Sequence, residues 1–189
     1  NLGHYINGEK TLEEIVVNSP SGLKVLPGTS GDGALANLSP DRLSAFIKEL
    51  IAAVNPIDFL IFDAAAGISS NVIPLLKECD HSIIVVRDDP SSIADSYGII
   101  KILKNEHGYE SLVLLANGVE SEQEGLSLHA RVNEACNKFL DTTVAYIGHV
   151  VEDSSIKDSA QKYRPVIEAF PASKASSNFR ALAKSVASL

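Results

Sequence analysis

Short apolar runs alternate with amphipathic helical patterns along almost the whole chain, and this alternation most constrains the fold. Strands are expected at residues 23–27, 58–63, 81–86, 111–117, 142–148 and 165–170. Helices are expected between them, at residues 39–54, 70–80, 91–108, 123–140, 154–163 and 174–189. Such alternation is typical of a mostly parallel sheet with helices on both faces. The sequence therefore predicts a doubly wound α/β fold.

Several helix ends carry their own signals. Ser39 is a good N-cap, and Pro40 fits the first helical position that follows it. In the helix of residues 91–108, Ser92 and Asp95 fit a capping box, and Gly108 stands where a helix stop is expected. The helix of residues 39–54 should bury one apolar face, made of Leu43, Phe46, Ile47 and Leu50.

Composition narrows the class of protein. The 189 residues, 45% of them apolar, suit a single globular domain that spans residues 1–189. The net charge of −8 disfavours nonspecific binding to nucleic acid. Cys79 and Cys136 do not form a disulfide framework, so a reducing, cytoplasmic setting is expected.

Polar residues follow several of the expected strands. Asp63 closes the run DFLIFD, and Asn117 closes the run LVLLAN. Ligands in parallel α/β sheets bind at the carboxyl ends of the strands. The same edge of the sheet should therefore gather Asp63, Asp88, Asp89, Asn117, Val151, Glu152 and Asp153.

Simpler interpretations stand beside these. Asp63 could cap a turn, Asn117 could be an ordinary turn residue, and the Asp88–Asp89 pair fits a solvated loop better than an acid–base pair. The segment GTSGDG (residues 28–33) is not followed by lysine and lacks the spacing of a serine nucleophile elbow. Cys79 has no zinc-type partners beyond His81, so a buried cysteine is the better interpretation.

Three stretches occur in an order that resembles a known class. They are DFLIFDAAAGISSNVIPLL (residues 58–76), SIIVVRDDPSSIADSYGIIKIL (residues 82–103) and the Asn-ended LLAN (residues 114–117). Together they resemble the MinD/ParA class of P-loop ATPases, and within it the FlhG (FleN) subgroup that regulates the number and placement of flagella. The resemblance continues to YRPVIEAFPASKASSNFRALA near the end, so it covers nearly the whole chain.

The resemblance implies a nucleotide site for ATP and Mg²⁺. Asp63 matches the catalytic Walker B-like acid, which acts on Mg²⁺ through bound water, and Gly67 matches the switch glycine near the γ-phosphate. Asn117 matches the residue that reads adenine through its amide. The adenine-flanking segment matches Val151, Glu152 and Asp153, with Val151 standing where the class usually has proline.

The 189 residues contain no G-x-x-x-x-G-K-[ST] pattern and no Gly-Lys pair. In the class, the phosphate-binding loop precedes the segment that the N-terminal residues resemble. The domain is therefore expected to be N-terminally incomplete, without its first βα segment, and to bind ATP and Mg²⁺ poorly by itself.

The resemblance also implies partners. It suggests an ATP-dependent homodimer and regulatory proteins that contact the helix from Ser92 to Asn105, with Asp95, Ser96 and Lys101 exposed. Members of the class can reach the membrane surface through a terminal amphipathic helix. Here residues 174–189 are short and alanine-rich, so packing against the sheet is favoured.

Three functions compete at this point. The first is an ATP-dependent switch that controls flagellar number and placement, or the position of a cell pole or division site. The second is a non-catalytic interaction module that keeps the fold without nucleotide. The third, a dinucleotide oxidoreductase, is weakest because no G-x-G-x-x-G opens a helix after a strand.

Overall fold

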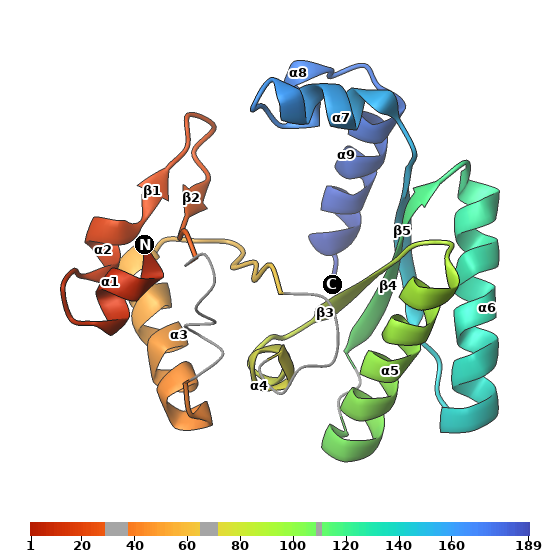
Figure 1. The fold of residues 1–189 in the computed structure, drawn as a ribbon, viewed down its shortest axis with the longest axis horizontal. Coiled ribbons are helices and arrows are strands. Elements are labelled where there is room, and N and C mark those ends of the chain that lie inside the picture. The colour runs from red at the N-terminus through yellow and green to blue at the C-terminus, as the bar shows by residue number, and fades with distance from the viewer. Residues whose placement is uncertain (29–37, 65–71, 109–110) are drawn as a thin grey trace. The chain divides into compact units, whose positions relative to one another are not determined.

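The structure is a computed structural model that describes residues 1–28, 38–64, 72–108 and 111–189. It divides into two compact units, Asn1–Glu78 and Cys79–Leu189, and each is taken by itself (Figure 1). The expectation of a single domain over residues 1–189 stays a prediction. Within the described ranges, no helix combines the length and the apolar character needed to cross a bilayer.

The first unit is built around helix α3 (Pro40–Val54), which begins after Ser39 as expected. Its predicted apolar face is buried against the two short helices α1 (Leu2–Ile6) and α2 (Leu12–Ile15). The two-residue strands β1 (Val17–Asn18) and β2 (Lys24–Val25) pair antiparallel. The strand expected at residues 23–27 therefore forms, but in a small hairpin rather than in the parallel sheet.

The run that ends on Asp63 differs from the prediction. It was expected to be a strand of the parallel sheet, but in the described part of the chain it joins no sheet. Leu60 and Phe62 pack against the core around α3, whereas Phe59 and Ile61 are 58% and 81% exposed. This alternation is that of an extended segment with one covered face. Within the first unit, only the face with Leu60 and Phe62 has a core to pack against.

The second unit contains a three-stranded parallel sheet in the order β3 (Ser82–Val86), β4 (Leu112–Val119), β5 (Ala145–Val151). Helices α5 (Pro90–His107) and α6 (Glu122–Leu140) connect the strands and cover one face (Figure 1). Helix α4 (Val72–Lys77), which has Pro74 in its first turn, belongs to the first unit and precedes this one in the chain. The parallel α/β architecture predicted from the alternating pattern is confirmed.

The opposite face of the sheet is covered over β5 by α9 (Lys174–Val186), which the chain reaches through α7 (Ser154–Gln161) and α8 (Val166–Ala169). Leu182 of α9 is buried with Val150 and Val166. A Cβ on Gly148 (φ +147°) would lie 2.8 Å from a methyl carbon of Leu182, so glycine lets the helix approach the strand closely. The prediction that residues 174–189 pack against the sheet is confirmed.

Two local predictions were wrong. Residues 165–170 were expected to be a strand, but α8 forms there, since Val166 turns inward to the core between α9 and β5. The cap of α5 is Asp89, whose carboxylate accepts from the Ser92 N–H at 2.9 Å, so Ser92 is not the N-cap. The strand expected at residues 81–86 forms as β3, and it is buried on one face, whereas Ile83 and Val85 on the other face are 41% and 53% exposed.

Candidate functional site

Asn117 lies near the carboxyl end of β4, in register with Val150 of β5. It does not end the strand, as the sequence suggested; β4 continues to Val119, with a register shift made possible by Gly118 at φ +69°. The Asn117 side chain is half-buried and makes no hydrogen bond within the described residues. Its amide therefore keeps a donor and an acceptor for a ligand at this edge.

Arg87, which was not predicted from the sequence, lies beside Gly118, the residue that follows Asn117. It directly follows β3, and its Nη1 would stand 2.9 Å from a Cβ placed on Gly118. Its backbone N–H donates to the Ser92 hydroxyl at 2.9 Å, which ties the strand end to the first turn of α5. In the sequence, a cation directly after an apolar run was the signal that could have pointed to Arg87.

The predicted adenine-flanking residues lie where β5 ends. Val151 is the last residue of β5 rather than part of a loop, and Glu152 follows it with an exposed side chain. The Glu152 N–H donates to the Val119 carbonyl at 2.8 Å. The segment of residues 151–153 is thus joined by its backbone to the end of the strand that carries Asn117. The structure brings these two predicted elements together.

The carboxylate of Asp153 is used for helix capping. It accepts from the Ser155 N–H at 2.9 Å, as the N-cap of α7, and from the Ala175 N–H at 3.1 Å in the first turn of α9. The pKa of Asp153 is lowered, first by the nearby Ser155 hydroxyl and then by these backbone N–H groups, although the hydroxyl itself lies outside hydrogen-bonding geometry. Both carboxylate oxygens of Asp153 are therefore already used as hydrogen-bond acceptors. The predicted nucleotide contact from residue 153 stays a prediction, and it would have to come from the backbone of this residue.

Asp63 belongs to the first unit, where its side chain is exposed. Gly67 lies outside the described residues, as does nearly all of the segment 28–33. In the described ranges, no three His, Cys, Asp or Glu side chains gather into a metal-binding group. A lone carboxylate still suits Mg²⁺ held largely by water. The roles predicted for Asp63 and Gly67 stay predictions.

Asp88 and Asp89, first assigned to a solvated loop, both have structural partners. Asp88 forms an ion pair with Arg131 of α6 (2.6 Å), and Asp89 caps α5. On α5, Asp95 and Lys101 are exposed as predicted. Ser96 is only 3% exposed, so it was wrongly placed on the exposed face of that helix.

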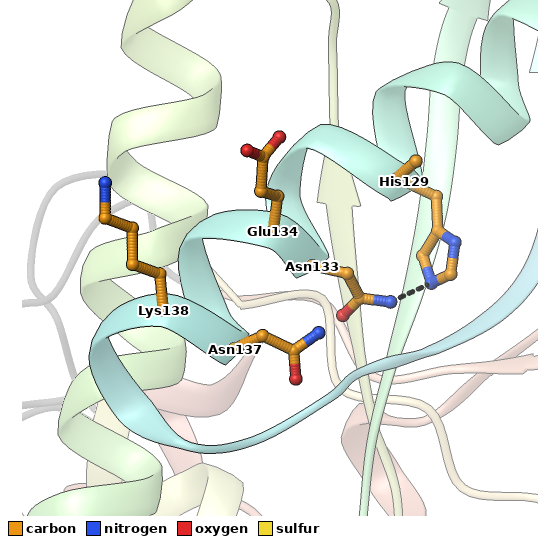
Figure 2. A pocket seen from close by; sticks show the side chains of 6 residues that line it. His129, Asn133, Glu134, Asn137 and Lys138 are labelled. Atoms are coloured by element: carbon orange, nitrogen blue, oxygen red, sulfur yellow. Dashed lines mark hydrogen bonds between the residues drawn. The ribbon is translucent and has the colours of Figure 1, made fainter.

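A shallow groove of about 780 Å³ lies on the second half of α6 (Figure 2). There Asn133 binds the backbone of Val144 on both sides: its Oδ1 accepts from the Val144 N–H at 2.8 Å, and its Nδ2 donates to the Val144 carbonyl at 3.1 Å. His129 Nε2 lies 2.7 Å from the same carbonyl. Since Val144 immediately precedes β5, the groove is at the opposite end of the strand from Val151. We interpret it as the joint between α6 and β5.

Comparison with known proteins gives two curated relatives. The antiactivator FleN of Pseudomonas aeruginosa is 36% identical over 185 residues, which are 98% of this chain and 66% of the relative. The flagellum site-determining protein YlxH of Helicobacter pylori is 32% identical over 159 residues, or 83% of this chain and 53% of the relative. The chain thus spans about two thirds of the first protein and about half of the second. No family model matches the chain.

Solved structures define the fold. The MinD cell division protein of Aquifex aeolicus superposes with a TM-score of 0.76 at 19% identity, over 100% of this chain and 75% of that one. MinD of Pyrococcus horikoshii, complexed with Mg-ADP, gives a TM-score of 0.71 at 19% identity, over 98% and 72%. The Aquifex aeolicus MinC:MinD complex gives 0.73 at 19% identity, over 100% and 73%. The fold is that of the MinD-like P-loop NTPases. The chain belongs to the MinD/ParA-type family, in its FlhG-like branch.

Proposed function

We propose that this chain is part of an ATP-dependent switch protein that regulates the number or placement of flagella. The observation that carries the proposal is the junction of β4 and β5, where the free Asn117 amide lies beside the backbone-linked segment 151–153. The names of the two curated relatives, an antiactivator and a flagellum site-determining protein, support flagella over cell division as the process served. Cytoplasmic location, with recruitment to the membrane surface, is part of the same proposal.

The residues at this junction fit the adenine end of a nucleotide. An amide that offers both a donor and an acceptor matches the edge of adenine, and leaving such a group unpaired discriminates strongly between bases. Asp63 would act on a metal-bound water, and Mg²⁺ would supply charge neutralisation on the phosphates. The 189 residues hold no lysine-containing phosphate loop, so by themselves they are expected to bind ATP weakly.

The test uses the full-length gene product and two pairs of variants. Asp63→Ala should abolish ATP hydrolysis while far-UV circular dichroism stays unchanged, and Asp58→Ala, an exposed acid in the same segment, should keep wild-type turnover. Asn117→Ala should reduce the preference for ATP over GTP, whereas Asn137→Ala, an exposed asparagine on α6, should not. Wild-type turnover in Asp63→Ala, or an unchanged base preference in Asn117→Ala, would remove that residue from the site.

Partners follow from the switch. We propose that ATP promotes a homodimer and that a regulatory protein contacts the exposed face of α5. Light scattering with and without ATP measures the first. For the second, charge reversal of Asp95 and Lys101 together should weaken binding of the regulator without lowering the melting temperature. A folded full-length protein that binds no nucleotide would instead favour the non-catalytic interaction module.

A further inference from the structure

Two side chains attach α9 to the last residue of β5 and to the segment that follows it. The Oδ1 atom of Asn178, on α9, accepts from the Val151 N–H at 3.2 Å. In the other direction, the Asp153 carboxylate accepts from the Ala175 N–H of α9 at 3.1 Å. Each contact joins a side chain of one element to the backbone of the other. Displacement of α9 would therefore break or strain the contacts of both Val151 and Asp153.

The Asn178 amide is oriented at both ends. Because its Oδ1 faces the Val151 N–H, its Nδ2 faces His149 Nε2 at 3.3 Å and donates when that nitrogen carries no proton. The side chain is half-buried, next to the core in which Leu182 of α9 packs with Val150. An amide held at both ends beside a packed core has little freedom to turn away from Val151.

The attachment continues to the strand that carries Asn117. The Glu152 N–H donates to the Val119 carbonyl at 2.8 Å, directly between the two residues that α9 contacts. Two hydrogen bonds, joined by the peptide bond between Val151 and Glu152, therefore connect α9 to the end of β4. The path lies within one compact unit.

We propose that Asn178 is a positioning residue for the adenine end of the nucleotide site and couples that site to α9. It touches no nucleotide itself; it holds the Val151 backbone, and through it the segment 151–153, in the geometry that receives the base. The proposal rests on the proposed function of nucleotide binding. Coupling between two sites is reciprocal, so a partner that shifts α9 changes nucleotide affinity, and nucleotide stabilises the docked α9.

The experiment compares three variants of the full-length gene product. Asn178→Ala removes the acceptor for Val151, Asn178→Asp keeps it, and Lys184→Ala changes an exposed residue of the same helix. Steady-state kinetics with ATP and Mg²⁺ should give an apparent KM about fivefold higher for Asn178→Ala, the size expected for one net hydrogen bond, with kcat within about twofold. Asn178→Asp and Lys184→Ala should stay near wild type.

A second measurement is independent of nucleotide. Amide hydrogen exchange in the absence of ATP should be faster at Val151 in Asn178→Ala and unchanged in the other two variants. Faster exchange with an unchanged KM would overturn the proposal, because the contact would then only hold the fold. Unchanged exchange would overturn it as well, since Asn178 would not hold Val151. Failure of the proposed function is seen separately, as absence of ATP binding by the wild-type protein.

Discussion

Replacing Asn133 by alanine tests whether the joint between α6 and β5 is as important as its geometry indicates. The Asn133 side chain makes two hydrogen bonds to the backbone of Val144, a residue that is only 2% exposed. After truncation the Val144 carbonyl keeps its contact with His129, but the buried Val144 N–H loses its partner. An orphaned buried donor costs about 1–3 kcal/mol, and the second bond contributes about 1 kcal/mol. We expect a loss of about 2–4 kcal/mol.

The matched control is Asn137→Ala, one turn further along α6. Asn137 is exposed and makes no hydrogen bond in the part of the chain that the structure describes. Both changes gain about the same helix propensity, roughly 0.5 kcal/mol, so the difference between the two variants isolates the contacts to Val144. Urea unfolding followed by circular dichroism, with equal m-values, measures that difference. A difference below about 0.5 kcal/mol would refute the reasoning.

Three further predictions concern the same unit. Gly125→Ala should lower the melting temperature, because its Cβ would stand 2.5 Å from the Tyr146 hydroxyl. Adding Tyr146→Phe, which removes that hydroxyl, should recover part of the loss, since the His149 Cβ at 3.1 Å remains; no recovery at all would contradict the contact. Asp153 has a folded-state pKa below its ordinary 3.8, so its ionised form stabilises the fold above that pH and the benefit is lost as pH falls through the folded pKa. The melting-temperature gap between wild type and Asp153→Ala should therefore be full at pH 7 and close in stronger acid, and a gap independent of pH would be inconsistent with it. Iodoacetamide should label Cys79 before Cys136, because the Cys136 thiol is fully buried and burial raises its pKa. Equal labelling of the two cysteines in the folded protein would be inconsistent with that burial.

The helices were well predicted where their signals are local. Ser39 and Pro40 start α3 where the sequence indicates, and Gly108 ends α5 in the left-handed conformation, at φ +61°. These signals depend on residues within one turn, so one sequence is enough to recognise them. The parallel sheet of the second unit was predicted on a different basis, namely the order in which strands and helices alternate along the sequence.

Features that depend on distant neighbours were missed. Residues 165–170 contain apolar side chains that suit a strand, but Val166 packs into a core supplied by α9 and β5, which local pattern does not reveal. Asp153 was chosen for its place after a strand, yet its carboxylate is occupied by Ser155 and by Ala175, which is 22 residues away. Topology alone predicted that Asn117 and the segment 151–153 lie together at the ends of β4 and β5. The contacts that each side chain makes required the three-dimensional structure, and the binding role of these residues stays a prediction.

The order of the sheet has a consequence for biosynthesis. Because β3, β4 and β5 lie side by side in the order in which they are made, each new strand finds its partner in the segment that left the ribosome just before it. Contacts between near neighbours in sequence form quickly and with little loop-closure cost. The second unit can therefore grow strand by strand during translation. The face of β5 opposite α6 stays exposed until α9, which is made after all three strands, packs on it.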